Sequence, residues 1–489
     1  MRASFWKLGR VVDCTGLENR QPARAPGFES LSFRQRTATP MLPRALRATI
    51  LLLASCAVFA CGGSDDTPAD NYRVTIESLP LVMAPRVAAA HDGSTWIAWT
   101  ESATAGETVF AASVDPSGRL IRSRVSVPVD SVVRDVQIVM AGSTPVAAWR
   151  DHASNGSAVH FASHVSGTWG TDLVTRAPIA GDLQMIPLKD GRASAVWQQT
   201  SVTGESELMS AQKSARGEWS VPALVAVAPA GTVMGAPRHA ASADGSLSVL
   251  WTEAPVQSGA PVAPQTLMSA RHGATTGYWE AAQAVDGGDS LHAAYDIVSA
   301  GPDGWLAVWF EGSPSGYPAL QSKRLTAGAW DTTPTRVDTG EDHTLRELAW
   351  VPTGSSSITL IWTGLSDAIA PSSIRSARFD VSQGAWSAPA LIARYDSGYP
   401  VLPRLASGGN GSAAAVWNVS QGSIDSPVLA STAAADPWRS PSLLDRDRSG
   451  LAADLALFSA DDLVTTWYRI GPQGRSDIVV DRRRLSGSQ

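Results

Sequence analysis

The chain has 489 residues, of which 44% are hydrophobic and only 17% are charged, with 42 Gly, 31 Pro, 18 Trp and 3 Cys. This composition excludes a disordered chain, a coiled coil and a small disulfide-stapled domain, because apolar residues are plentiful and cysteines are rare. The net charge is -6, but residues 1–60 hold nine Lys or Arg and three acids, so the remainder has 39 − 9 = 30 basic and 45 − 3 = 42 acidic residues. A net of about −12 there argues against nucleic acid as a partner, which needs clustered cations.

The first sixty residues contain a targeting segment. From Met41 onward, Arg44 and Arg47 precede an apolar run that extends from Thr49 to Ala60. This run is too short to cross a hydrocarbon layer of about 30 Å as a helix, so we expect a cleaved signal peptide over residues 41–60. Residues 1–40 have no apolar periodicity, and we interpret them as a non-structural leader or a misassigned translation start.

The end of this segment, VFAC followed by GGSDD, resembles the lipobox of bacterial lipoproteins, whose cysteine is acylated and becomes the mature amino terminus. The resemblance implies lipidation of Cys61, with Cys56 in LASC as the alternative. Gly62 after the cysteine implies an outer-membrane lipoprotein, facing the periplasm or the exterior. Residues 61–71 would then form a tether to a membrane-held lipid. Because no cysteine follows Cys61, we expect a fold without disulfide bonds.

Tryptophan recurs in the rest of the chain at intervals of about fifty residues, which indicates an internal repeat. A second series of tryptophans follows the first at a shorter distance. The first series is Trp99, Trp149, Trp197, Trp251, Trp309, Trp362, Trp417 and Trp467, and the second is Trp169, Trp219, Trp279, Trp330, Trp386 and Trp438. We expect both series to pack between repeats. Three tryptophans outside them are candidates for exposed aromatic platforms: Trp96, Trp305 and Trp350.

Each repeat resolves into four short strands joined by turns. In the first repeat, PRVAAA and TWIAWTE flank the turn HDGS, and TVFAASV and LIRSRVSV flank the turn DPSG. No helical pattern separates the strands, so the predicted class is all-β. Four-stranded repeats of this length are typical of β-propeller blades, and we predict a β-propeller over residues 72–489 with eight blades, or seven as the alternative. The last repeat lacks its fourth strand, which we expect Tyr72–Leu79 to supply, closing the ring.

Charged residues recur where the first strand of a repeat begins and the second strand ends, two places that lie on one face of a propeller. Thirteen residues before the repeat tryptophan stand Arg86, Arg238, Arg404 and Asp454, and two residues after it stand Glu101, Asp151, Glu253 and Glu311. The arginines and these last four acids are candidates for a ligand-binding surface. The alternative is that they pair with each other, Arg86 with Glu101 and Arg238 with Glu253, which would contribute only about 0 to 1 kcal/mol each.

The segment APRVAAAHDGSTWIAWTE resembles the opening blade of sialidase-type propellers, and GAWSAP, GEWSVP and DPWRSP are similar to their Asp-box turns, although the Asp is mostly missing. In that family three arginines clamp a substrate carboxylate, a Tyr activated by Glu is the nucleophile, and an Asp is the acid. The resemblance implies that Arg86, Arg238 and Arg404 correspond to the clamp, although they fall in repeats 1, 4 and 7. Tyr399 alone has a suitable place, and no Glu partner can be assigned to it.

Sequence motifs for other chemistry are missing. The chain contains no GxSxG, GxGxxG, GxxxxGKS or HExxH motif, and His160 and His164 alternate on one strand without a third metal ligand. We therefore expect no catalytic residues, no metal and no cofactor. The predicted function is a lipid-anchored, non-catalytic binding or interaction scaffold of the cell envelope, whose partner is a glycan or an envelope protein. The alternatives are an exo-glycosidase of the sialidase kind and a purely assembly role.

Overall fold

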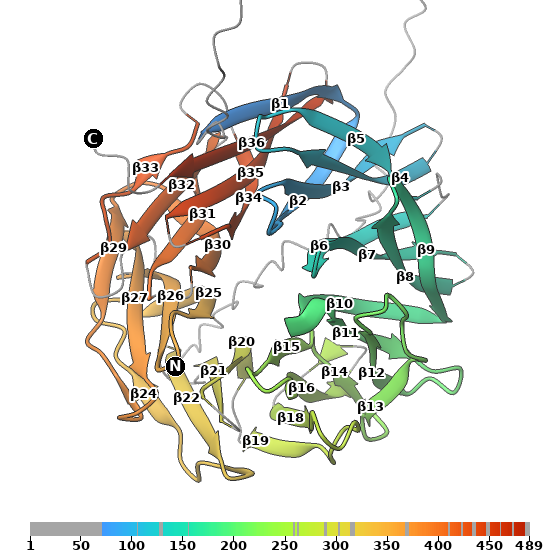
Figure 1. Ribbon diagram of the computed structural model, residues 1–489. Coiled ribbons are helices and arrows are strands. Elements are labelled where there is room, and N and C mark those ends of the chain that lie inside the picture. The colour runs from blue at the N-terminus through green and yellow to red at the C-terminus, as the bar shows by residue number, and fades with distance from the viewer. Residues whose placement is uncertain are drawn as a thin grey trace, which may run out of the picture. The chain divides into compact units, whose positions relative to one another are not determined.

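Eight antiparallel sheets form a ring in the computed structural model (Figure 1). The structure describes residues 71–484 except for 105, 127–130, 155, 258–259, 262–263, 288–290, 302–303, 313–317, 367–370, 409–410, 422–423, 433–436, 446–449, 460 and 472–473. All described residues lie in the second of the two units into which the chain divides, Pro68–Gln489. Across the described part of the chain the regular elements are strands and one 3-10 turn, η1 (Lys189–Gly191). The predictions of an all-β class and of eight blades rather than seven are confirmed.

The first four blades follow one another along the chain, and each begins at the axis of the ring. Blade 1 consists of β2 (Leu81–Ala89), β3 (Thr95–Ala103), β4 (Gly106–Val114) and β5 (Leu120–Arg124). Blade 2 consists of β6 (Val132–Ala141), β7 (Thr144–Ala153), β8 (Gly156–Val165) and β9 (Thr168–Ala177), and blade 3 of β10 (Ile179–Pro187), β11 (Ala193–Thr200), β12 (Ser206–Lys213) and β13 (Ala223–Val227). In blade 4 the inner strand is divided into two, and the strands are β14 (Thr232–Met234), β15 (Arg238–Ala241), β16 (Leu247–Gln257), β17 (Ala260–Pro261), β18 (Thr266–His272) and β19 (Gln283–Gly287).

The other four blades repeat this order, with a divided outer strand in blades 5 and 6. Blade 5 consists of β20 (Leu291–Ser299), β21 (Trp305–Gly312), β22 (Ala319–Thr326), β23 (Ala329–Trp330) and β24 (Thr335–Val337), and blade 6 of β25 (Thr344–Pro352), β26 (Ser357–Leu365), β27 (Ser372–Asp380), β28 (Ala385–Trp386) and β29 (Ala390–Tyr395). Blade 7 consists of β30 (Tyr399–Ser407), β31 (Ala413–Gln421), β32 (Ile424–Thr432) and β33 (Ser442–Leu443), and blade 8 of β34 (Gly450–Leu457), β35 (Asp462–Ile470), β36 (Ser476–Arg484) and β1 (Tyr72–Leu79).

The tryptophans of the first series lie in the second strands and form the core between blades. All eight are buried, and Trp197, for example, packs with Val146 and Phe161 of blade 2. A β-strand turns alternate side chains to opposite faces, and each blade has neighbours on both faces, so small or apolar residues fill both. The packing role predicted for this series is confirmed.

The tryptophans of the second series lie on or beside the outer strands and bridge to the preceding blade through their indole N–H. The acceptor is a serine hydroxyl in most of these bridges. The pairs are Trp169 to Ser123, Trp279 to Ser210, Trp330 to Ser269, Trp386 to Ser322 and Trp438 to Ser376, at 2.7–2.9 Å, and Trp219 reaches Asp172 at 3.3 Å. This series therefore links neighbouring blades by hydrogen bonds as well as by contact.

The three tryptophans outside the two series differ in exposure. Trp305 is buried in the core between blades 4 and 5, so the prediction that it is an exposed platform is wrong. It begins β21, where its side chain points into the sheet interface. Trp96 is half-buried against His164 and Trp169 of blade 2. Trp350 is also half-buried, and it packs beside the core between blades 5 and 6.

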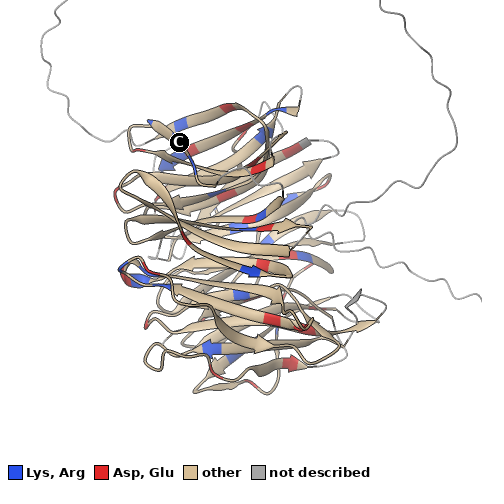
Figure 2. Cartoon of the chain, turned by 90° about the vertical axis from the view of Figure 1, so that its right-hand side faces the viewer, with Lys and Arg blue, Asp and Glu red and all other residues tan. Residues whose placement is uncertain are grey.

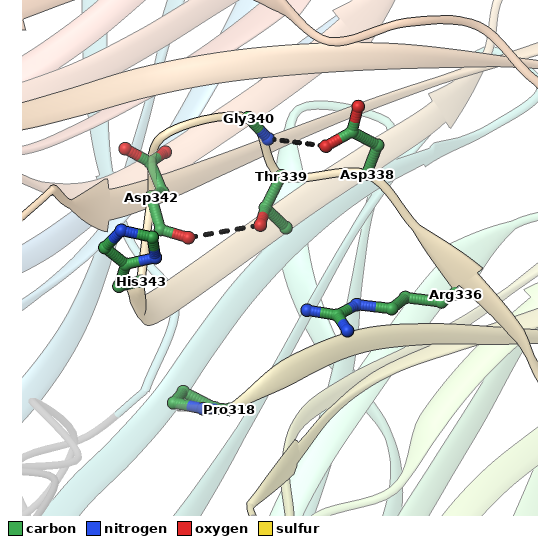
Figure 3. A pocket seen from close by; sticks show the side chains of 7 residues that line it. All are labelled: Pro318, Arg336, Asp338, Thr339, Gly340, Asp342 and His343. Atoms are coloured by element: carbon green, nitrogen blue, oxygen red, sulfur yellow. Dashed lines mark hydrogen bonds between the residues drawn. The ribbon is translucent and has the colours of Figure 1, made fainter. Parts of the chain in front are cut away.

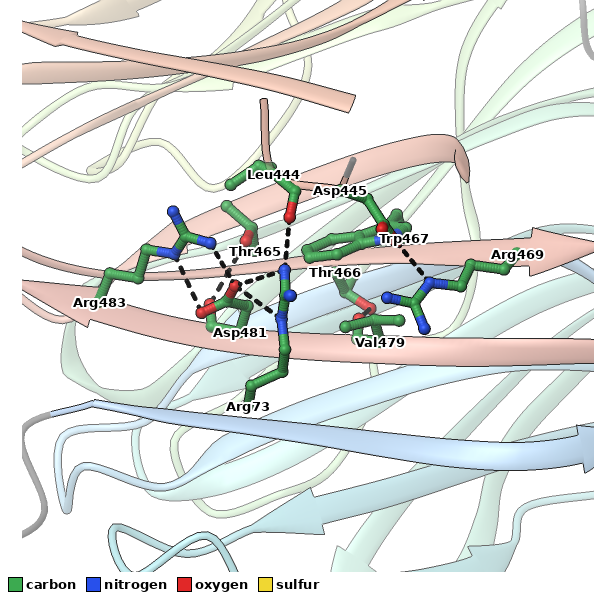
Figure 4. A network of polar contacts seen from close by, with 10 residues as sticks. All are labelled: Arg73, Leu444, Asp445, Thr465, Thr466, Trp467, Arg469, Val479, Asp481 and Arg483. Atoms are coloured by element: carbon green, nitrogen blue, oxygen red, sulfur yellow. Dashed lines mark hydrogen bonds and ion pairs between the residues drawn. The ribbon is translucent and has the colours of Figure 1, made fainter. Parts of the chain in front are cut away.

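The ring closes through β1, which pairs antiparallel with β36 and becomes the outer strand of blade 8. This confirms the closure predicted for Tyr72–Leu79. A polar network holds the seam: Arg73 forms an ion pair with Asp481 at 3.0 Å, donates a hydrogen bond to the Leu444 carbonyl of blade 7 and lies over the Trp467 ring (Figure 4). Asp481 also pairs with Arg483 at 2.6 Å. The network thus joins the closing strand β1 to β36 and to blade 7.

Charged residues of both signs are interspersed over the blades that face the viewer in Figure 2. In the part of the chain that the structure describes, no helix has the length and apolar character needed to span a membrane. The lipidation candidates Cys61 and Cys56, the signal peptide 41–60, the leader 1–40 and all of the tether except Asn71 lie outside the described residues.

Candidate ligand-binding site at the centre of the ring

Eight residues occupy equivalent places on the inner strands, and we call them the inner ring. Each pairs with the residue that precedes the repeat tryptophan on the second strand. The pairs are Arg86 with Ala98, Gln137 with Ala148, Gln184 with Val196, Arg238 with Leu250, Asp296 with Val308, Ala349 with Ile361, Arg404 with Val416 and Asp454 with Thr466. All eight are partly exposed, so solvent reaches them although the inner strands surround the axis (Figure 1).

The strand pairing is interrupted just before each of the three arginines. Each of the three follows a proline, which has no N–H to donate to the ladder and therefore favours an interruption. The register of β2 shifts between Met83 and Arg86, and that of β30 shifts in the same way before Arg404. Ala84 and Leu402, within these bulges, have positive φ angles of 20° and 54°. A β-bulge re-aims the side chains beside it, and in blade 4 the break between β14 and β15 precedes Arg238 in the same way.

The charges of two of the predicted arginines, Arg86 and Arg238, act on the third, Arg404. The charge of Arg86, followed by burial, lowers the pKa of Arg404 to about 10. Arg238 adds to this effect, whereas Asp454 and Glu347 oppose it. Charges weaken with distance, so their effect on Arg404 indicates that Arg86, Arg238 and Arg404 lie around one centre, although they belong to blades 1, 4 and 7 of the ring.

Two acids of the inner ring, Asp454 and Asp296, accept hydrogen bonds from backbone amides rather than from the arginines. Asp454 accepts a hydrogen bond from the Val87 amide at 3.1 Å, and Asp296 accepts one from the Ile297 amide at 2.8 Å. Burial raises the pKa of the Asp296 carboxyl, and the charges of Arg238 and Arg404 and a hydrogen bond from Trp350 act against that rise. Among the described residues, none of the three guanidinium groups has a hydrogen bond or an ion pair.

The predicted acids at the ends of the second strands lie within the blades. Glu101 accepts a hydrogen bond from the Trp99 indole N–H at 2.7 Å and forms an ion pair with Arg122 at 2.6 Å, so its salt bridge goes to Arg122 rather than to Arg86. Glu253 accepts the Trp251 N–H at 3.1 Å. These carboxylates satisfy buried donors, which would be costly to leave unpaired.

Asp151 and Glu311 also have partners inside their blades. Asp151 accepts a hydrogen bond from His160 at 2.9 Å, and the His160 ring stacks on Trp149. Glu311 accepts one from Gln321 at 2.8 Å. Glu101, Asp151, Glu253 and Glu311 therefore do not join the arginines at the centre, and a direct contact between these acids and a ligand stays a prediction. Within the described residues no cluster of His, Cys, Asp or Glu suited to a metal ion is found.

Tyr399 lies at the start of β30, half-exposed, with the Arg346 guanidinium 5.3 Å from its ring centre. Sequence reasoning missed Asp296, although it stands thirteen residues before Trp309, the spacing shared by the three arginines. It also missed Glu347, whose carboxylate accepts the Leu402 amide and whose charge reaches Arg404. No spacing rule points to Glu347, because in blade 6 the register shift lies nearer the start of the inner strand, between Leu345 and Glu347.

Two pockets lie away from this centre. One, of about 380 Å³, is formed mainly by the connection between β24 and β25, and its lining includes Arg336, Asp338 and His343 (Figure 3). The other, of about 470 Å³, lies at the ends of β1 and β36, where Arg73 and Asp481 line it. Most of the charged groups of the second pocket belong to the seam network. We place the candidate site at the centre, because there cations converge without contact partners.

No family model matches the chain, and no curated protein matches it. Several solved structures match at low identity. A protein of unknown function from Dyadobacter fermentans is 13% identical, with 62% of this chain and 94% of that chain covered and a TM-score of 0.41. An ulvan lyase, which is a polysaccharide lyase, is 10% identical, with 76% and 96% covered and a TM-score of 0.46. A sialidase from Streptococcus pneumoniae is 7% identical, with 85% and 95% covered and a TM-score of 0.40. At these TM-scores the likenesses carry no argument about what this protein binds.

Proposed function

We propose that the protein is a non-catalytic binding scaffold of the cell envelope whose ring centre takes up an anionic group of its ligand. The observation that carries the proposal is the convergence of Arg86, Arg238 and Arg404, each partly exposed and each without a contact partner among the described residues. Guanidinium groups recognise carboxylates and sulfates through paired N–H donors. An anion bound between them would relieve the repulsion that lowers the pKa of Arg404.

The membrane part of the proposal rests on the sequence. The apolar run before Cys61 and the small residues around it support a lipid anchor at this cysteine. Mass spectrometry of the mature protein should find an acylated amino-terminal Cys61, and Cys61→Ser should release the protein from the membrane fraction. A mature terminus at Cys56, or an unmodified protein, would refute this part alone.

The anion site is tested by calorimetric titration with trigalacturonic acid, and with galactotriose as its uncharged counterpart. We expect saturable binding of the acid only, weakening as salt rises, because exposed charges are screened. Replacement of any one arginine by Gln should weaken binding by about tenfold, the loss of one charge-assisted contact. The matched control is Arg216→Gln, at an exposed arginine in the turn between β12 and β13. Equal binding of both sugars would refute the site, and so would an Arg216→Gln variant that weakens binding as much as the variants of Arg86, Arg238 and Arg404.

An exo-glycosidase is the second candidate, and Asp296 favours it. A carboxyl whose pKa is raised by burial, and which lies near enough to Arg238 and Arg404 for their charges to act on it, is suited to act as a general acid. Release of the leaving group from a fluorogenic sialoside should then be abolished by Asp296→Asn and by Tyr399→Phe. Absence of turnover in the unaltered protein would leave the binding scaffold as the function.

A further inference from the structure

Five of the eight inner strands begin with exposed apolar side chains at equivalent places. These residues pair with the residue three positions after the repeat tryptophan, as in the pairs Leu81 with Ser102 and Tyr399 with Ser420. We call them the apolar rim: Leu81 is 49% exposed, Val132 40%, Ile179 52%, Leu291 45% and Tyr399 42%. They come from blades 1, 2, 3, 5 and 7, so they are distributed around the ring (Figure 1).

The apolar rim and the inner ring lie at two levels along the same strands. In blade 1 the rim residue Leu81 precedes Arg86 by five residues, and in blade 7 Tyr399 precedes Arg404 by five. At about 3.3 Å per residue, the two levels are on the order of 15 Å apart. A ligand that contacts both must therefore project from the rim toward the centre.

Exposed apolar residues that are scattered singly need no explanation, but here they recur at one structural position in five blades, and from this recurrence we argue an interaction surface. Sugar rings are recognised by stacking on aromatic faces, and the rim offers only one aromatic ring, Tyr399, which already contacts Arg346. On a lipid surface apolar groups insert only about 5 to 10 Å past the headgroups, whereas here the cations lie on the order of 15 Å from the rim, at the centre of the ring. Leucine, valine and isoleucine side chains fit the apolar side chains of a polypeptide, and the three arginines complement an acid.

We propose that this face binds a projecting polypeptide segment of a partner protein, with an acidic side chain directed at Arg86, Arg238 and Arg404 and apolar residues resting on the apolar rim. The proposal rests on the anion site proposed above and names its partner class. About five extended residues span the two levels, so the acid and the apolar residues of the segment lie about that far apart in its sequence.

The test uses random twelve-residue peptides displayed on phage and selected on the purified protein. Enriched peptides should carry an acid four to six residues from an apolar pair, and synthetic copies should bind about tenfold more weakly when that acid becomes its amide. The triple variant Leu81→Ser, Ile179→Ser, Leu291→Ser should lose a similar factor. The matched control is Ile121→Ser, Val165→Ser, Leu224→Ser, at residues of similar exposure that lie outside the rim.

Each outcome decides between the two proposals. Enrichment that depends on both the rim and the arginines supports the peptide partner. No enrichment, or peptides that bind the rim variant as well as the unaltered protein, overturns it. Trigalacturonic acid binding to the same rim variant is measured in parallel: if it persists while peptides fail, only the partner class is wrong. If trigalacturonic acid does not bind the unaltered protein, the anion site itself is refuted.

Discussion

Glu101 provides a direct test of whether the acids that end the second strands are structural. Its side chain is 5% exposed and accepts hydrogen bonds from the fully buried Trp99 indole and from Arg122, which is 35% exposed. Glu101→Ala leaves the indole N–H unpaired, at a cost of about 1 to 3 kcal/mol. It also removes an ion pair worth about 1 kcal/mol, since Arg122 is partly solvated. The expected loss of unfolding free energy is about 2 to 4 kcal/mol, against a typical total of about 5 to 15.

The Glu101→Gln variant separates the two contributions, because the amide oxygen still accepts the indole N–H while the charge is lost; we expect a cost of about 1 kcal/mol. Glu253→Ala is the matched control for loss of the indole acceptor in another blade, since Glu253 accepts the Trp251 N–H at 3.1 Å. Urea unfolding is followed by tryptophan fluorescence and by circular dichroism, whose coincidence checks two-state behaviour. An Ala variant at Glu101 that unfolds at the same urea concentration as the unaltered protein would show that the reasoning is wrong.

Three further predictions concern the blade contacts, the seam and pH. A double-mutant cycle of Ser269→Ala with Trp330→Phe should give a coupling of about 1 kcal/mol, and additive effects would contradict the inter-blade hydrogen bond. Asp481→Asn should destabilise more than Arg73→Ala in urea unfolding, because Asp481 is nearly buried and pairs with two arginines whereas Arg73 is 42% exposed; the reverse order would contradict the seam network. Burial, and then the charge of a neighbouring histidine, lowers the pKa of His239 to about 3, so the unfolded chain binds a proton there between pH 6.5 and 3 and the folded chain does not. Stability should therefore fall between pH 6.5 and 4.5 more steeply than in His239→Gln, and parallel curves would refute this.

The number of blades and the closure of the ring were predictable from the sequence, because each repeat contributes one buried tryptophan to one sheet. A side chain that recurs once per sheet marks the same position in every sheet, and Tyr72–Leu79 matched the strand that the last repeat lacks. Alternation along a strand also indicates the role of Glu101: residues two apart point to the same face, so Glu101 lies beside Trp99 rather than at the axis. The partner Arg122, on the fourth strand, was not predictable from spacing.

The convergence of the arginines was not settled by the sequence. Spacing placed Arg86, Arg238 and Arg404 at equivalent positions, but their direction depends on the bulges before them, and their distances depend on the width of an eight-bladed ring. The prediction for Trp305 was wrong because a tryptophan outside both series can still be buried. Its place at the start of β21 directs its side chain into the core. Both outcomes depend on how the blades pack around the ring, which the spacing of residues in the sequence does not give.

Closure by β1 has a consequence for biosynthesis. The strand β1 is synthesised first, but its partner β36 is the last strand to be synthesised. Asn71 and Arg484, which share a hydrogen bond across this pair, are 413 residues apart in the chain. Until then the nascent protein has a free edge at each end, which favours pairing with other chains. A chaperone that covers these edges during translation, or a circular permutant whose new ends lie in a loop between blades, should therefore raise the yield of folded protein.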